Sequence, residues 1–310
     1  MMQNPQYYFG LPGDLIALPR PTRGMPTTPR RGRTAHSLIG GGTATTVRAR
    51  TRSGWTLAWP WLDEATAQAV LDYTEGIFGE GPFRFVDPMW RNVLPANASV
   101  VGRMSGDPKI GSGPSWRPGG GDLLVLDPAA TVGPNRTSGV MRWTGAAAND
   151  YLVLGKRDEA TSTGLPIFDG PNEIPMVPGE SVAWSFYCRL ASGTSATLAA
   201  RGMGLTAAGA AASSTDGTGV VLSASWQRAV LVAGTGTLGA TAAYMRPMIR
   251  CTAASGSPVI QIAAPQVEYG PAATDWLSGS GSPRVLIVDD PEITMEQQGY
   301  RTPKLVIREA

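Results

Sequence analysis

Histidine and cysteine, which supply many catalytic groups and metal ligands, are scarce in this chain. His36 is the only histidine, and Cys188 and Cys251 are the only cysteines. A Ser-His-Asp device would have to use His36, which lies among arginines and without the strand–turn–helix motif that presents a nucleophile. One histidine and two distant cysteines cannot complete a zinc site unless carboxylates supply the remaining ligands. We therefore expect a solvated His36 and no catalytic cofactor.

Both cysteines lie in strand-like patterns with apolar neighbours two positions away, such as Phe186 and Leu190 beside Cys188. Free cysteine behaves as a small apolar residue, and thiols stay reduced in the cytosol. We predict two buried core thiols rather than a disulfide.

Paired carboxylates are a second route to chemistry, because two of them can hydrolyse a glycosidic bond. Asp158, Glu159, Asp169 and Glu173 fall in one stretch, but nothing in the sequence sets the distances between them. The glycine runs at 40–42 and 119–121 lack a following helix and a P-loop lysine, so no phosphate cradle is expected. The sequence predicts solvated loop carboxylates and a protein that is not an enzyme.

Aromatic side chains could form a platform for sugars. The candidates are Trp116, Trp143, Tyr151 and Tyr187. Trp116 lies between the turn signals Gly113-Pro114 and Pro118-Gly119, so it is the one expected to be most exposed. Each of these residues also suits a buried core position, and that alternative stays open.

The composition predicts an all-β protein with two domains. The chain has 310 residues, of which 39 are glycine, 26 are proline and only 16% are charged. Many turns and few solvated helices follow from such a composition. The net charge of +2 gives no global reason to bind nucleic acid or a membrane surface. No apolar run approaches the roughly 20 residues that span a bilayer, so we expect no membrane insertion.

Arginines dominate the stretch between Asp14 and Asp63, which contains eight of them and no acidic residue. A strand over 45–52 would place Arg48, Arg50 and Arg52 on one face. Ser53-Gly54 resembles a hairpin turn that leads into a returning strand over 55–59. The arginine face either meets an acidic surface of a neighbouring subunit, lines a passage for DNA, or is an ordinary solvated face.

One helix and a series of short strands complete the pattern. Apolar residues from Leu62 to Tyr73 recur at helical spacing, with Gly76 and Gly79 after them. Short strands are expected at 83–88, where Pro88 stops the strand, and at 284–288 and 304–308. Pro265 should end regular pairing after a strand over 259–264. Eight further strands favour a two-sheet sandwich: 122–126, 139–143, 151–154, 181–190, 196–200, 220–222, 227–232 and 243–250.

The segment that follows the strand at 259–264 carries a recognisable motif. It consists of Gln266, Glu268, Gly270, Ala273, Thr274 and Trp276, preceded by Pro178-Gly179-Glu180, by residues 225–228 and by residues 243–247. In this order, the residues resemble the jelly-roll carbohydrate-binding modules of bacteriophage tail proteins, over about residues 95 to 280. Ser278-Gly279 departs from the usual Pro-Gly. The resemblance implies a sugar-binding surface, for which Trp116, Trp143 and Tyr187 are the candidates, and such modules can carry a structural calcium ion.

The N-terminal half, with its Phe-Arg-Phe-Val-Asp-Pro run at 83–88, resembles minor tail proteins of the distal-tail type from actinobacteriophage-like siphophages. The resemblance implies a ring-forming β-sandwich domain, built from 1–92 together with 283–310, and an inserted jelly roll over 93–282. It further implies a homo-oligomeric ring, a hexamer. In such a ring the charge pattern of Arg48, Arg50 and Arg52 suits the subunit interface, with the solvated face as the alternative. The partners would be the tail tube, the tail hub and tape-measure proteins, and bacterial cell-envelope carbohydrate. The protein would be assembled in the host cytoplasm and reside at the virion tail tip. The alternative is a carbohydrate-binding or glycan-hydrolysing tail component.

Overall fold

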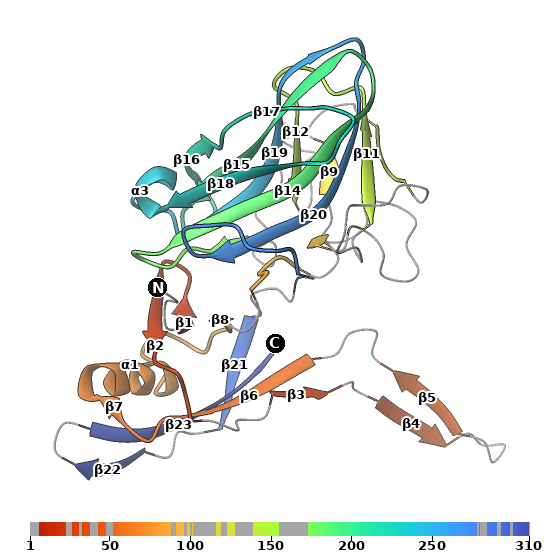
Figure 1. Cartoon of the computed structure of the whole chain (residues 1–310). Coiled ribbons are helices and arrows are strands. Elements are labelled where there is room, and N and C mark those ends of the chain that lie inside the picture. The colour runs from red at the N-terminus through yellow and green to blue at the C-terminus, as the bar shows by residue number, and fades with distance from the viewer. Residues whose placement is uncertain are drawn as a thin grey trace. The chain divides into compact units, whose positions relative to one another are not determined.

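Strands dominate the structure, a computed structural model that divides into two compact units (Figure 1). Unit 1 comprises residues 1–11, 16–86 and 283–310, and unit 2 comprises residues 12–15 and 87–282. The residues that the structure describes are 6–22, 27–30, 33–37, 43–47, 52–87, 91–95, 98–99, 101, 116–118, 123–127, 139–154, 173–277, 279, 284–289, 293–297 and 300–309. The predicted all-β class is confirmed.

Unit 1 is built on one sheet that draws strands from both ends of the chain. Its main path runs β2-β1-β8-β21-β23-β6-β3, and β7 and β22 also pair with β23. The strands are β1 (Tyr7–Leu11), β2 (Asp14–Leu18), β3 (Thr27–Arg30), β6 (Arg52–Ala58), β7 (Leu62–Asp63), β8 (Phe83–Val86), β21 (Arg284–Asp289), β22 (Ile293–Gln297) and β23 (Tyr300–Glu309). A separate hairpin joins β4 (Arg33–Ser37) to β5 (Thr43–Val47).

The predicted helix is α1 (Glu64–Thr74), which follows β7. Asp63 is its N-cap, because a side-chain oxygen accepts a hydrogen bond from the Thr66 backbone nitrogen at 3.0 Å. Beyond the other end, Gly76 has a φ of 74°, a left-handed conformation that favours glycine. Tyr73 on the buried face of the helix meets the rings of Phe9 and Phe83 edge-on. Capping and aromatic packing together hold α1 in place.

The expected turn at Ser53-Gly54 is wrong, because both residues lie inside β6. Ser53 is paired with Pro29 of β3, and Gly54 is paired with Thr28 of β3 and Arg308 of β23. A dipeptide that suits a turn is therefore held extended by partners on two sides. Arg48 and Arg50 lie outside the described residues, and Arg52 opens β6 with its side chain outside the description. The predicted arginine face stays a prediction.

Unit 2 is a sandwich of two antiparallel sheets. The five-stranded sheet runs β10-β11-β20-β14-β18, and the seven-stranded sheet runs β16-β15-β19-β12-β9 with β13 and β17 at its sides. Their bounds are β9 (Trp116–Pro118), β10 (Leu123–Leu126), β11 (Val140–Thr144), β12 (Tyr151–Leu154), β13 (Ile174–Pro175), β14 (Ser181–Ser192), β15 (Ser195–Leu205), β16 (Ala211–Asp216), β17 (Val220–Val221), β18 (Gln227–Gly234), β19 (Tyr244–Ser255) and β20 (Val259–Tyr269), with the short helix α3 (Thr235–Leu238). Each strand predicted for this region is present.

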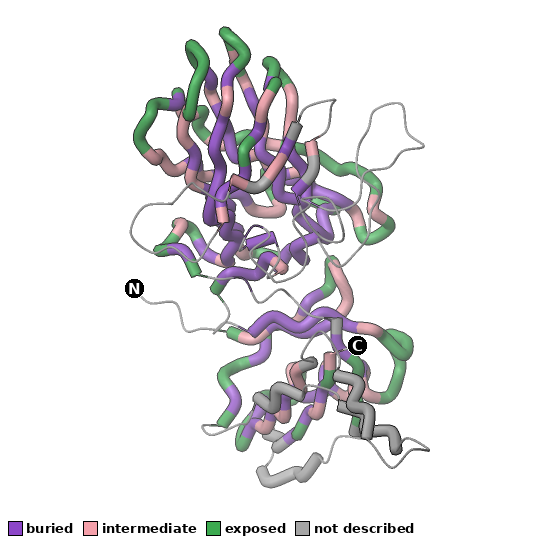
Figure 2. The backbone as a smooth tube through the Cα atoms, turned by 90° about the vertical axis from the view of Figure 1, so that its right-hand side faces the viewer, coloured by how far each residue is buried: buried purple, intermediate pink, exposed green. Residues whose placement is uncertain are grey.

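Tryptophans join the two sheets of unit 2. Trp184 of β14 stacks on Trp116 of β9, with ring centroids 5.4 Å apart, and donates its indole hydrogen bond to the Met248 carbonyl of β19 at 2.9 Å. Figure 2 shows the buried residues concentrated along these strands. Trp184, Phe186 and Cys188 therefore face inward, as predicted, and the alternate residues of β14 face outward.

Pro265 does not end β20, contrary to the sequence-based expectation. The strand continues to Tyr269, and its register against β14 shifts between the pairs Ser185/Gln266 and Tyr187/Ala263. Ala264 has a φ of 51° at this shift. The proline therefore sits at a β-bulge, where the ladder does not need its missing N–H.

Candidate functional site

The motif at 266–276 forms a clamp that folds the end of unit 2 back over the five-stranded sheet. Glu268 accepts hydrogen bonds from the Thr274 backbone nitrogen and hydroxyl, both at 2.7 Å. Gln266 donates to Glu268 at 2.7 Å and accepts from the Leu277 nitrogen at 2.9 Å. Gln266 and Glu268 are both buried. The Gln266 amide and the Glu268 carboxylate thus form hydrogen bonds that hold residues 274–277 in place.

Trp276 is the apolar part of this clamp. It packs with Val140, Ala263 and Ala264 in one buried cluster, and its indole nitrogen donates to the Pro265 carbonyl at 3.2 Å. The partly buried rings of Tyr187 and Trp226 pack against the same cluster. The motif residues that resemble sugar-binding modules therefore have a structural role. The accessible surface next to the clamp includes the rings of Tyr187 and Trp226.

Two rows of residues cross the outer face of the five-stranded sheet, the face opposite to Trp184. Neighbouring strands place Val125, Arg142, Gln261, Arg189 and Trp226 in one line, here called the arginine row. The adjacent line is the tyrosine row, made of Asp127, Val140, Ala263, Tyr187 and Arg228. Directly opposed residues of an antiparallel sheet share a face, so each row is contiguous across the strands.

Polar contacts fix the side chains of the arginine row. Gln261 donates to the Asp127 carboxylate at 2.8 Å and accepts from Nε of Arg189 at 2.5 Å. The Arg189 guanidinium lies over the Trp226 ring, 4.7 Å from its centroid. This stacking orients the guanidinium plane, and no described residue accepts a hydrogen bond from its terminal nitrogens.

The tyrosine row repeats the pairing of a ring with an arginine. The Arg228 guanidinium lies 5.4 Å from the centroid of the Tyr187 ring, and its terminal nitrogen donates to the Ser185 hydroxyl at 2.9 Å and the Thr274 carbonyl at 2.6 Å. Tyr187 and Arg228 are both half-buried. In the two rows the aromatic rings support guanidinium groups, and the groups offered to a ligand are mainly hydrogen-bond donors.

The structure places the predicted sugar-binding residues differently. Trp116, expected at the surface, is 1% exposed; it stacks on Trp184 and donates to the Ala98 carbonyl at 3.0 Å. Trp143 is fully buried on the inner side of β11. Tyr187 alone of the three lies on the outer face. Sequence reasoning missed Trp226, although its spacing of two from Arg228 matches that of Tyr187 and Arg189.

Of the four carboxylates proposed as catalytic candidates, Glu173 is the one in the described part of the chain. Asp158, Glu159 and Asp169 lie outside it, whereas Glu173 is buried and paired with Arg246. No group of three His, Cys, Asp or Glu side chains suited to a metal occurs among the described residues. His36 lies in β4, with its side chain outside the description. Within the described ranges, no helix is long and apolar enough to cross a membrane.

Both cysteines are buried free thiols, as the sequence predicts. Removal from water penalises the thiolate, so burial raises the pKa of Cys188 to about 12. A neutral thiol at physiological pH is a core side chain and not a nucleophile.

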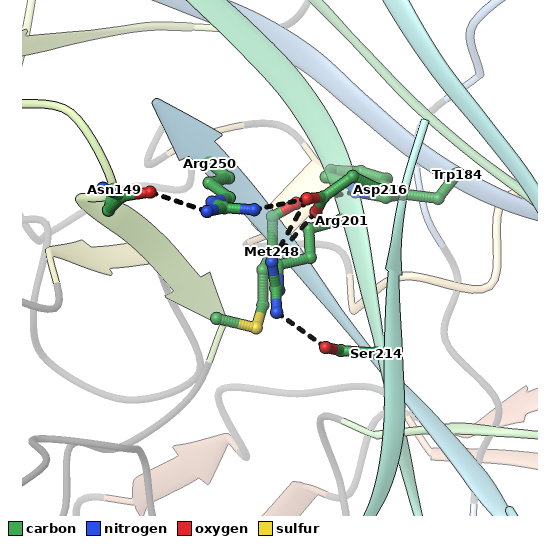
Figure 3. A network of polar contacts seen from close by, with 7 residues as sticks. All are labelled: Asn149, Trp184, Arg201, Ser214, Asp216, Met248 and Arg250. Carbon is green, nitrogen blue, oxygen red and sulfur yellow. Dashed lines mark hydrogen bonds and ion pairs between the residues drawn. The ribbon is translucent and has the colours of Figure 1, made fainter. Parts of the chain in front are cut away.

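The outer face of the seven-stranded sheet carries a contrasting network (Figure 3). Arg201 and Arg250 both pair with the Asp216 carboxylate, at 3.1 Å and 2.5 Å. Their other terminal nitrogens donate to Ser214 and Asn149, each at 2.6 Å. Here the arginines of β15 and β19 share one counter-ion and tie it to the loop before β12.

Comparisons with known proteins give remote likenesses to solved structures. No family model matches the chain, and no curated protein matches it. An arabinose-bound MgGH51 α-L-arabinofuranosidase is similar at 13% identity and a TM-score of 0.41, over 58% of this chain and 26% of that one. The CBM22-1 xylan-binding domain of Paenibacillus barcinonensis Xyn10C is similar at 13% identity and a TM-score of 0.35, over 54% of this chain and 92% of that domain. The enzymatically active domain of bacteriophage CBA120 tailspike protein 4 is similar at 13% identity and a TM-score of 0.38, over 57% of this chain and 21% of that one. The chain thus spans about a quarter of the arabinofuranosidase.

Proposed function

We propose that this protein is a structural, non-enzymatic component of a phage tail tip, a minor tail protein of the distal-tail type whose unit 2 contacts glycans on the host surface. The tail assignment rests on the sequence resemblance of the N-terminal half. Unit 1 agrees with it in one respect, because β21 and β23 from the chain end pair with β8 and β6 from its beginning. Such a unit would pack in a ring against tail tube and hub proteins.

The observation that carries glycan contact is the pair of rows on the five-stranded sheet. Glycan sites combine aromatic side chains with a few fixed polar groups that set orientation and specificity. The two rows supply both, with Tyr187 and Trp226 beside the oriented groups of Arg189, Gln261 and Arg228. The clamp, Val140, Ala263 and Gln261 are buried, so a ligand can reach the exposed Arg142 and the half-buried Arg189, Arg228, Tyr187 and Trp226 of these rows.

Hydrolysis is less well supported than binding. A glycosidase needs two carboxylates that face its substrate. Glu173, the described member of the four candidates, is 1% exposed and paired with Arg246. A buried carboxylate paired with an arginine has a structural role. We therefore assign glycan binding, and not hydrolysis, to unit 2.

Glycan arrays probed with the full chain test this proposal. Tyr187→Ala and Trp226→Ala should each weaken binding at least about tenfold, because each removes a ring that orients an arginine. Trp61→Ala is the matched control, since Trp61 is a 63% exposed tryptophan of unit 1. Equal binding by wild type and both ring variants, with folding intact by circular dichroism, would sink the assignment of this face.

The ring is tested separately with the triple variant Arg48→Ser, Arg50→Ser, Arg52→Ser. If these arginines meet an acidic partner surface, the variant should remain folded but assemble poorly, and raised salt should weaken wild-type assembly. Light scattering measures both effects. Assembly that is identical for variant and wild type at every ionic strength would show a solvated face instead.

A further inference from the structure

We infer that the glycan bound by the two rows is acidic, a saccharide that carries carboxylate or phosphate groups. The inference rests on the proposed glycan contact and names the class of glycan. It comes from the balance of charge on this face and from the way its arginines are held.

The face presents three guanidinium groups without ion-pair partners. Arg142, Arg189 and Arg228 lie on three different strands, and within the described ranges none of them forms a salt bridge. Glu268, the buried carboxylate on this side, spends its oxygens on Gln266 and Thr274. Asp127 accepts from Gln261, and Asp275 in the covering segment is exposed. Among the described residues, therefore, no carboxylate forms an ion pair with these three guanidinium groups, and Asp127 reaches Arg189 only through Gln261.

The positions of two of these arginines suit an extended ligand. Arg142 and Arg189 flank Gln261 on the neighbouring strands β11 and β14. Adjacent strands are about 4.8 Å apart, so the two backbones are separated by roughly 10 Å. Arg142 is exposed and Arg189 is half-buried. An oligosaccharide lying along the arginine row could therefore present an acidic group to each of them.

The donors that remain match an oxyanion. Arg189 uses Nε for Gln261 and stacks on Trp226, and among described residues its two terminal nitrogens have no hydrogen-bond partner. Arg228 adds positive charge rather than free donors, because its Nε is buried and one terminal nitrogen donates to Ser185 and Thr274. A planar guanidinium held in one orientation binds carboxylate or phosphate through two parallel hydrogen bonds. A neutral sugar offers hydroxyl groups and would leave the charge unmatched.

Calorimetric titration of the full chain tests the inference with matched probes. The probes are an oligogalacturonate, the same oligosaccharide with its carboxyl groups methyl-esterified, and a sugar-phosphate polymer. We expect at least one acidic probe to bind about tenfold or more tightly than the ester, because hydrogen bonds to charged groups are the stronger ones. That preference should fall as salt rises. Preference for the phosphate polymer over the uronate would identify phosphate as the acidic group.

Variants separate this inference from the proposed function. Arg142→Gln and Arg189→Gln should each lower the affinity for the acidic probe about tenfold and leave the ester unchanged, whereas Arg308→Gln, an exposed site in unit 1, should change neither. Equal affinity for acid and ester, or no effect of either variant, would overturn the inference. If no saccharide binds at all, or Tyr187→Ala and Trp226→Ala leave all binding intact, the glycan contact on which it rests fails as well.

Discussion

The two outer faces of the unit 2 sandwich both present arginines, but they hold them differently. On the seven-stranded sheet, Arg201 and Arg250 share the Asp216 carboxylate and fill their remaining donors with Ser214 and Asn149 (Figure 3). On the five-stranded sheet, Arg189 and Arg228 lie over aromatic rings instead.

This difference separates arginines that stabilise the fold from arginines that can bind a ligand. A carboxylate occupies the guanidinium edge with hydrogen bonds, whereas an aromatic ring contacts only the guanidinium face. Stacking therefore orients an arginine without occupying its edge; the terminal nitrogens of Arg189 have no hydrogen-bond partner among the described residues, whereas one of Arg228 donates to Ser185 and Thr274. The contrast between the two faces can be tested by substitution on each of them.

Removing the clamp should destabilise the five-stranded side most. Trp276→Ala deletes a side chain that is 7% exposed and uncovers Val140 and Ala263. Large-to-small changes of a buried tryptophan cost about 3–5 kcal/mol, and we expect that loss in the unfolding free energy of unit 2. Urea denaturation followed by tryptophan fluorescence measures it. Leu277→Ala, at a 46% exposed neighbour, should cost far less; equal losses would show that the clamp is not what covers the sheet.

Gln261→Glu should make the outer face of the five-stranded sheet resemble that of the seven-stranded sheet, because it adds a carboxylate beside two arginines. The new carboxylate would lie between Arg142 and Arg189, as Asp216 lies between Arg201 and Arg250. Binding of acidic saccharide should fall about tenfold or more, because the arginines then have a counter-ion within the protein. We expect no gain in stability, because the variant loses the hydrogen bond from Gln261 to Asp127 and places two carboxylates side by side. Calorimetric titration at unchanged affinity would contradict this role for Arg142 and Arg189.

Asp216→Ala should make the outer face of the seven-stranded sheet resemble that of the five-stranded sheet, because it leaves arginines without an ion pair. It removes the counter-ion of two arginines whose side chains are 23% and 30% exposed. Because solvent screens such pairs, we expect a loss of about 1 kcal/mol in unfolding free energy, smaller at high salt. Ser214→Ala keeps the ion pairs and serves as the control. A loss that does not respond to salt would point to packing rather than charge.

Asp63 provides a case in which no arginine takes part. Its side-chain and backbone hydrogen bonds with Thr66 lower the pKa of the carboxyl group below the usual 3.8. The contribution of the ionised cap is therefore present above about pH 4 and is lost as the pH falls through the lowered pKa. Asp63→Ala should cost about 1 kcal/mol at neutral pH. This gap should narrow in acid, as followed by denaturation at several pH values; a gap that is constant with pH would exclude the ionic contribution.

Local pattern was sufficient for most strands of unit 2 and for the helix, but not for β1 to β4, because the proline-rich residues 1–42 read as irregular. Alternation along 181–190 predicted which residues of β14 face inward, and Trp184, Phe186 and Cys188 are buried. Helical spacing up to Tyr73 with glycines beyond it predicted α1. These predictions held because burial of one face imposes a period on the sequence, whatever partner buries it.

Pairing between distant segments decided the rest. Turn signals around Trp116 suggested exposure, but stacking on Trp184 buries it. Ser53-Gly54 suits a turn, but β3 and β23 hold it extended, and a bulge lets β20 pass Pro265. The arginine row is the clearest case, because Arg142, Gln261 and Arg189 come from three separate strands. The sequence predicted that all three residues lie on strands and that Arg189 faces outward, because these follow from local alternation. The sheet register depends on contacts far apart in the chain, and it alone brings the three residues into one site.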